Sequence, residues 1–166
     1  MNPIEKLGEQ SIVLFLLFYI YNFITFKNNY SLMMFITVTI NIFINFYTKL
    51  KLIDIMKPYN HKLPILGSFC RPIDRDCKNM TATGYGMPSG HSQVITFIPA
   101  IYYFLYKDFE TFSFSKFLTM CCISLFVMAT RYTSKMHSLQ QIIAGSSIGI
   151  ILAFISAKSL RYLNIF

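Results

Sequence analysis

Residues 84–93 read GYGMPSGHSQ and join a polar loop to an apolar helix. Pro88 ends the preceding segment, and Gly90 lets the backbone approach a ligand closely. Free amides at the start of the following helix favour an anion, and His91 lies in the first turn, where it could hold or donate a proton. A simple loop-to-helix junction capped by Ser89 would explain the same residues. The stretch therefore predicts an anion site only if other segments supply matching side chains.

Composition places the chain in a membrane. Its 166 residues are 54% hydrophobic, their mean hydropathy is +0.48, and the apolar residues occur in blocks. This pattern predicts an all-α, multi-pass transmembrane bundle with a single domain over residues 1–166. The net charge is +8, but the basic residues are scattered between the blocks, so we expect anionic membrane lipids or a phosphorylated substrate as partners, and no nucleic acid. Cys121 and Cys122 are expected to pack as small hydrophobes.

Five apolar blocks predict about five membrane-spanning helices, and the first two are near the lower length limit for crossing a bilayer. They cover residues 11–26, 31–47, 91–106, 117–130 and 139–157. A polar loop separates the second and third blocks, and Lys49 and Lys51 after the second could snorkel to the headgroups. Five crossings bring the end of block two, the start of three, the end of four and the start of five to one membrane surface. Gly145 and Gly149 would let the last helix pack closely against a neighbour.

That shared surface collects residues able to bind and cleave a phosphate. They are Arg71, Ser89, Gly90, His91, Arg131, His137 and Gln141. Arginine binds phosphate oxygens in a bidentate fork, and two histidines can divide the roles of nucleophile and acid. Gln141 could accept a hydrogen bond from one ring nitrogen of His137 and leave the other free to attack phosphorus, if the last helix starts early. Each of these residues alone more often has a structural role, such as anchoring a helix end at the membrane interface. Because three separate segments place phosphate-type ligands on one face, we expect a functional site there.

These motifs resemble those of the type 2 phosphatidic acid phosphatase family, a membrane relative of the vanadium haloperoxidases. The matches are Arg71-Pro72, Pro88-Ser89-Gly90-His91, and Arg131 with His137 six residues later, and the resemblance covers residues 57–157. The family's first-motif lysine would fall at Pro64, with Lys62 nearby and Lys57 further away. The family's last aspartate falls at Gln141. Glutamine there, with residues 85–93, resembles the dolichyl diphosphate phosphatase branch.

The resemblance implies an integral-membrane lipid phosphatase. His137 would attack phosphorus and form a phosphohistidine, and His91 would protonate the leaving oxygen. Ligands for the phosphate oxygens would be Arg71, Arg131, Ser89, the Gly90 amide and Lys62. No cofactor and no metal are expected, since Asp74 and Asp76 show no ligand spacing.

Several functions remain open on these residues. A polyisoprenyl diphosphate is the first choice of substrate, and phosphatidic acid or another lipid monophosphate is the second. The same histidines would serve a lipid phosphotransferase that uses an alcohol in place of water. A catalytically silent relative that binds anionic lipid is a further alternative, and the sequence leaves the oligomeric state open.

The orientation of the site rests on conflicting signals. More lysines and arginines fall on the active-site face than on the opposite one, which would place it in the cytosol. However, Arg71 and Arg131 are needed there for phosphate. Cys70 and Cys77 could pair only in an oxidising compartment, and Asn79 begins an Asn-Met-Thr glycosylation sequon. With the family resemblance, these features predict a lumenal or extracytoplasmic site.

Overall fold

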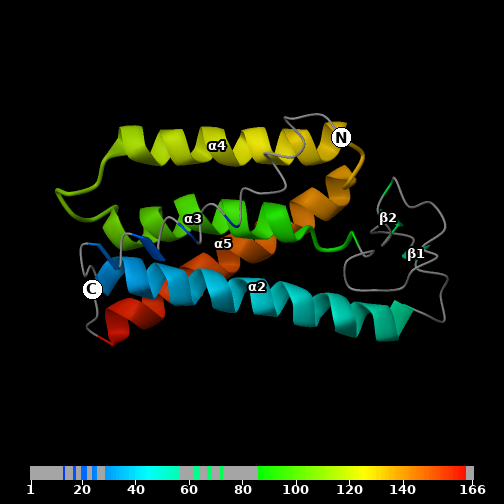
Figure 1. Ribbon diagram of the computed structural model, residues 1–166, viewed down its shortest axis with the longest axis horizontal. Coiled ribbons are helices and arrows are strands. Elements are labelled where there is room, and N and C mark those ends of the chain that lie inside the picture. Colours follow the sequence, from blue (N-terminus) through cyan, green and yellow to red (C-terminus); the bar gives the residue numbers. More distant parts are fainter. Residues whose placement is uncertain are drawn as a thin grey trace.

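The computed structural model describes residues 29–56, 62–63, 67–68, 72 and 86–163, and six separate positions between 13 and 25. Four helices, labelled as in Figure 1, fill most of these ranges: α2 (Asn29–Met56), α3 (Gly90–Tyr106), α4 (Phe114–Thr133) and α5 (Leu139–Tyr162). Within the described ranges the only strands are the two-residue antiparallel pair β1 (Lys62–Leu63) and β2 (Gly67–Ser68). The predicted all-α class is confirmed.

Three of these helices are long and apolar enough to cross a membrane. The candidate spans are Ser31–Ile55, Phe114–Thr133 and Leu139–Tyr162. Helix α3 has 17 residues and extends about 26 Å at 1.5 Å per residue, close to the roughly 30 Å of a hydrocarbon core. The first predicted block falls largely outside the described residues, so the count of five spans stays a prediction.

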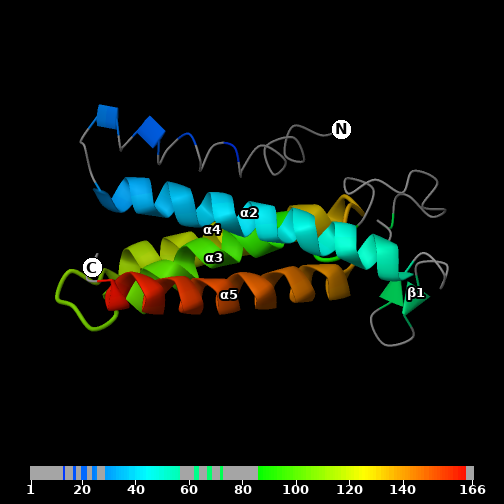
Figure 2. The same ribbon diagram turned by 90° about the horizontal axis from the view of Figure 1, so that it is seen from below.

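Helix α3 is the centre of the described bundle. Figure 2 shows α2 and α5 on opposite sides of it, and α4 also packs against it. Its residues Phe97, Ile98, Ile101 and Leu105 join one hydrophobic core with α2 and α5. A helix that is hydrophobic on most sides is stable only when neighbours cover it, as they do here. This central helix is the one that begins with the motif residues Gly90 and His91.

The α3–α5 contact is the most extensive one between helices, and two glycines make it possible. A Cβ at Gly145 would overlap the carbonyl of Ser89, and one at Gly149 would overlap the carbonyl of Gln93. The close packing predicted for this glycine pair is therefore confirmed, because the missing side chains let the two backbones touch. The first of these contacts involves Ser89, the N-cap residue of α3.

The described helices bring their ends together as the sequence predicted. The end of α2, the start of α3, the end of α4 and the start of α5 lie at the same end of the bundle (Figure 1). The predicted helix bounds were too short, since α2 runs to Met56, α4 to Thr133 and α5 to Tyr162. Isolated polar residues do not end a helix when no glycine or proline follows at once, and α2 stops just before Pro58.

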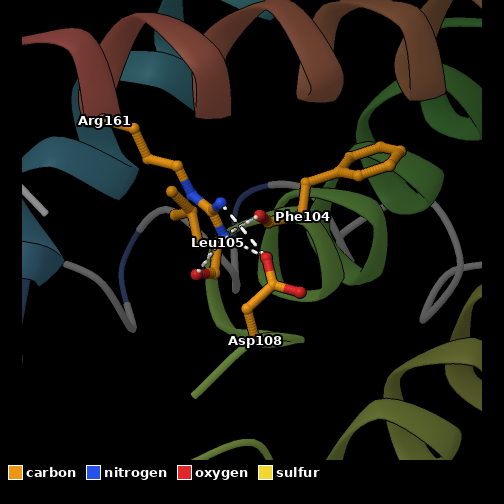
Figure 3. A network of polar contacts seen from close by, with 4 residues as sticks. All are labelled: Phe104, Leu105, Asp108 and Arg161. Atoms are coloured by element: carbon orange, nitrogen blue, oxygen red, sulfur yellow. Dashed lines mark hydrogen bonds and ion pairs between the residues drawn. The ribbon is translucent and has the colours of Figure 1, made fainter.

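At the opposite end of the bundle, Arg161 of α5 binds the last turn of α3 (Figure 3). Its Nη2 donates to the carbonyl oxygens of Phe104 at 2.7 Å and Leu105 at 2.9 Å, and both terminal nitrogens lie 3.3 Å from the Asp108 carboxylate. The last carbonyls of a helix have no partner within the helix, so the guanidinium caps α3. Together with the glycine contacts, this cap holds α3 and α5 in register at both ends.

Candidate phosphate-binding site

The start of α3 is capped and buried. Ser89 is the N-cap, and its hydroxyl accepts hydrogen bonds from the Ser92 amide at 3.3 Å and the Ser92 hydroxyl at 3.0 Å. Its own amide donates to the Gln141 carbonyl at 3.1 Å, after a cis Met87–Pro88 peptide bond. The capping role considered for Ser89 is confirmed, and a role in phosphate binding stays a prediction. The first amides of α3 have no partner within the helix and suit an anion.

The Arg-x5-His spacing follows from the way α4 ends. The Met136 amide donates to the Arg131 carbonyl and the Lys135 amide to the Tyr132 carbonyl, while Lys135 has a positive φ of 57°. These two bonds and the left-handed residue make a Schellman motif, which reverses the chain. The His137 amide also donates to the Arg131 carbonyl, at 3.1 Å. The helix end itself therefore brings the two motif residues together, with Arg131 in the last turn of α4 and not in the link predicted for it.

His137 and Gln141 are in contact at the start of α5. Ser138 is the N-cap, and Gln141 completes a capping box by accepting the Ser138 amide on its Oε1 at 3.1 Å. The same oxygen lies 3.3 Å from Nδ1 of His137. The predicted pairing is thus present, but α5 does not start early: His137 lies just before the cap. Both side chains are buried, with exposed fractions of 2% and 0%.

This hydrogen-bond network defines the tautomer of His137. A backbone amide can only donate, so the Gln141 atom that faces Ser138 must be the amide oxygen. An amide oxygen can only accept, so Nδ1 of His137 carries the proton in this contact. In the neutral ring Nε2 then holds a lone pair. The arrangement leaves the ring nitrogen that a nucleophile needs on the side away from Gln141.

Gly86 lets the central motif pack directly against the Gln141 side chain. A Cβ at Gly86 would overlap the Gln141 side-chain amide, so only glycine leaves room for it. The Ser89 amide meanwhile donates to the Gln141 backbone carbonyl. Residues before and at the start of α3 therefore hold the partner of His137 from two sides. Gly86 belongs to the central motif, but the sequence predicts no role for it, because this contact joins residues 55 positions apart.

A cavity of about 460 Å³ lies beside His137. Its walls come from the α4–α5 link and from Pro72 in the long loop; the lining residues are Pro72, Tyr132, Thr133, Lys135, His137, Ser138, Leu139 and Gln140. Pro72 of the first motif and His137 of the third motif therefore line the same cavity. Arg131 is 2% exposed and His91 half-buried in the first turn of α3.

Some predicted residues lie outside the described part of the chain. These are Arg71, Lys57, Cys70, Cys77 and Asn79, and the side chain of Lys62 is also not described. Six of the eight predicted site residues can be placed, and all six lie at one end of the bundle: Ser89, Gly90, His91, Arg131, His137 and Gln141. Among the described residues, no three His, Cys, Asp or Glu side chains gather as a metal would need.

Comparisons with known proteins show the family of this chain. The model of the PAP2 superfamily matches residues 33–165. The chain belongs to the PAP2 superfamily. It is also 33% identical over 98 residues to the Schizosaccharomyces pombe protein named palmitoyl-protein thioesterase-dolichyl pyrophosphate phosphatase fusion 1. That match covers 54% of this chain but 15% of the yeast protein. No solved structure matches the chain.

The family and the three candidate spans identify a PAP2 membrane protein.

An apolar groove of about 360 Å³ lies between α3 and α4, lined among others by Thr96, Pro99, Phe117 and Met128. Met128 precedes Arg131 by three residues, or about 4.5 Å along the helix axis. The groove therefore begins close to the candidate site and runs toward the opposite end of the bundle.

The two cysteines of α4 differ in their surroundings. Cys121 lines the groove and is half-buried, whereas Cys122 is exposed. The packing predicted for both therefore holds for Cys121 only, because neighbouring residues on a helix point about 100° apart.

One set of buried polar residues in this PAP2 chain was not predicted from the sequence. Asn41, Asn45 and Lys49 of α2 have exposed fractions of 1%, 6% and 8%. The prediction that Lys49 snorkels to the headgroups is wrong. The signal was present as polar residues every four positions in an apolar block, which places them on one helix face.

Proposed function

We propose that this PAP2 protein is a multi-pass lipid phosphatase that removes the terminal phosphate from a polyisoprenyl diphosphate. The observation that carries the proposal is the contact between His137 Nδ1 and Gln141 Oε1 beside the cavity. It gives Nδ1 an acceptor, so that in the neutral ring the lone pair needed for attack is on Nε2, and it lies at the same end of the bundle as the buried Arg131 and the first turn of α3. A histidine with only a structural role would not need the end of α4, the start of α3 and the start of α5 to meet around it.

The reaction has two steps in this proposal. Nε2 of His137 attacks the terminal phosphorus, and the bond from phosphorus to the bridging oxygen breaks while His91 donates a proton to that oxygen. Water then attacks phosphorus and gives a proton to His91, while the bond from phosphorus to Nε2 of His137 breaks and phosphate leaves. Arg131 and the Gly90 amide hold the oxygens as negative charge builds. The other proposed oxygen ligands are Arg71, Ser89 and Lys62.

A lipid substrate is supported by the apolar groove. It opens between two helices of the bundle and begins near Arg131, so a hydrocarbon chain could lie in it while the phosphates reach the cavity. The yeast relative's name includes dolichyl pyrophosphate phosphatase, which supports a polyisoprenyl diphosphate over phosphatidic acid. A lumenal or extracytoplasmic site is part of the proposal.

The test is an assay of the detergent-purified protein against a polyisoprenyl diphosphate and phosphatidic acid. We expect phosphate release from the diphosphate, inhibition by vanadate, and complete loss in His137→Ala. When the terminal phosphate of the diphosphate carries ³²P, an alkaline quench should trap a base-stable phosphohistidine on the wild-type protein and none on His137→Ala.

Other outcomes would point to the alternatives. Faster release from phosphatidic acid would change the substrate, and a phosphorylated alcohol among the products would indicate a phosphotransferase. A His137→Ala variant that works at the normal rate would overturn the mechanism. Lipid binding without turnover of any substrate would indicate a silent relative.

A further inference from the structure

The first turn of α3 is held from two sides by the helices that flank it (Figure 2). On the α5 side, the Ser89 amide donates to the Gln141 carbonyl, and the Ser89 carbonyl packs against Gly145. On the α2 side lies Asn45. A Cβ at Gly90 would meet three atoms first, all of them in the Asn45 side chain, with Oδ1 the nearest at 2.9 Å. The missing side chain at Gly90 therefore lets Asn45 lie against the turn whose amides suit an anion.

Asn45 belongs to a set of buried amide side chains that links α2 to α3. Its Nδ2 donates to Oε1 of Gln93 at 2.7 Å and makes a longer contact, 3.5 Å, with the Pro88 carbonyl oxygen. Nε2 of Gln93 donates to the Asn41 backbone carbonyl at 3.1 Å and to Asn41 Oδ1 at 2.6 Å. The side chains of Asn41, Gln93 and Asn45, here called the amide ladder, are all buried.

The backbone groups at the two ends of the amide ladder define how its side chains are oriented. A carbonyl oxygen can only accept, so the Gln93 atom that faces the Asn41 carbonyl is the Nε2 donor, and Oε1 faces Asn45. Asn45 then presents Nδ2 to Gln93 and to the Pro88 carbonyl, and Oδ1 is the atom nearest to Gly90. Asn41 accepts on Oδ1 although its buried Nδ2 has no partner among the described residues. The ladder therefore has one direction, which sets the way Asn45 meets the turn.

Amide side chains also join membrane helices where no site is present. Two observations set this ladder apart from a contact that only joins helices. It ends on the backbone of Pro88 and Gly90, which belong to the central motif. Gln93 also lies in the first turn of α3, and its backbone amide donates to the Ser89 carbonyl at 3.0 Å. A displacement of the ladder would therefore move the N-cap of α3 and the amides that follow it.

We infer that Asn45 and Gln93 are positioning residues, which hold the start of α3 in the geometry that phosphoryl transfer needs. The inference rests on the proposed function and adds two residues that touch no substrate atom. In the proposed reaction the Gly90 amide holds a phosphate oxygen as negative charge builds, and a misplacement of about 1 Å can cost roughly 10²-fold in rate. The α5 contacts limit movement of the turn on one side, and Asn45 limits it on the other.

The test compares Asn45→Leu and Gln93→Met with the control Asn41→Leu. Leucine and methionine keep the branched and straight shapes of the amide side chains but carry no donor or strong acceptor. The control removes another buried ladder side chain, yet it leaves Gln93 the Asn41 backbone carbonyl as an acceptor and does not touch the turn. Measured in detergent are kcat and KM for the diphosphate, and the inhibition constants of orthovanadate and inorganic phosphate.

The two inhibitors separate positioning from folding. Orthovanadate imitates the five-coordinate transition state, whereas inorganic phosphate resembles the ground state. For Asn45→Leu and Gln93→Met we expect kcat to fall and the vanadate constant to rise by roughly 10- to 100-fold, with KM and the phosphate constant within about threefold of wild type. Asn41→Leu should keep all four values within about threefold. A variant that merely folded less well would lose kcat but keep its inhibition constants, because these do not depend on the folded fraction.

The outcomes that would overturn the inference are distinct from failure of the proposed function. Asn45→Ala gives the same test if the leucine variant does not fold, as judged by thermal unfolding. Unchanged vanadate constants in the folded variants would overturn the inference and leave the phosphatase proposal intact, and so would an equal rise in Asn41→Leu. A wild type that turns over no lipid phosphate would refute the proposed function. Calorimetric titration with orthovanadate would then still test the ladder, since equal affinities of wild type and Asn45→Leu would overturn its positioning role.

Discussion

Replacing Gln141 by leucine tests the part of the site that orients the nucleophile. Leucine has a similar volume but no acceptor, so the Ser138 amide and His137 Nδ1 lose the oxygen that lies 3.1 Å and 3.3 Å from them. Gln141 is fully buried, so water cannot easily replace that oxygen. An unsatisfied buried donor costs about 1–3 kcal/mol, and we expect the free energy of unfolding to fall by that amount.

The effect on catalysis should exceed the effect on stability. Without the acceptor, His137 no longer prefers the tautomer with its proton on Nδ1, and Nε2 loses its orientation. Loss of a positioned proton-transfer or nucleophilic group commonly reduces rates by about 10²- to 10⁴-fold. We expect kcat to fall within this range while KM changes little, because the phosphate ligands remain in place.

Gln141→Glu separates orientation from packing. Glutamate has the same length and offers acceptor oxygens to both partners, so kcat should stay within about tenfold of the wild type. Ser147→Ala is the control, since this residue of α5 is exposed and does not line the cavity. The assay is phosphate release from a polyisoprenyl diphosphate, with thermal unfolding measured in parallel. The reasoning would be refuted if Gln141→Leu kept normal kcat, or if Gln141→Glu lost as much activity as Gln141→Leu.

Two further predictions concern packing and orientation. Gly145→Ala should destabilise the protein by about 1–3 kcal/mol and lower kcat, because the added methyl pushes the Ser89 backbone away from α5; a normal melting temperature, equal to that of the exposed control Ser147→Ala, would contradict this. With the two cysteines of α4 replaced by alanine, Cys70 and Cys77 in sealed membranes should label from outside only after reduction; labelling that needs permeabilisation and no reductant would reverse the proposed orientation.

The sequence by itself determined the class of the protein and the end of the bundle at which the candidate site residues lie. Apolar blocks of near-spanning length that cross a bilayer one after another must alternate in direction, so the ends of α2 and α4 meet the starts of α3 and α5. Local geometry also explains the third motif. The Schellman turn after Arg131 and the capping box at Ser138 involve residues within seven positions, and sequence spacing reports such contacts directly.

Only the tertiary structure decided which polar residues are buried and what they touch. A lysine near the end of an apolar block has the same local pattern whether it snorkels, as proposed for Lys51, or is enclosed, as Lys49 is. The pairing of Gly86 with Gln141 and of Gln93 with Asn45 joins residues about 50 positions apart. Such contacts depend on which faces of two helices meet. That choice is made by the packing of α2 and α5 around α3 as a whole. The close contacts at Gly145 and Gly149 fix the rotation of α5 against α3, and the buried hydrogen bonds of Gln93 with Asn41 and Asn45 fix the rotation of α2.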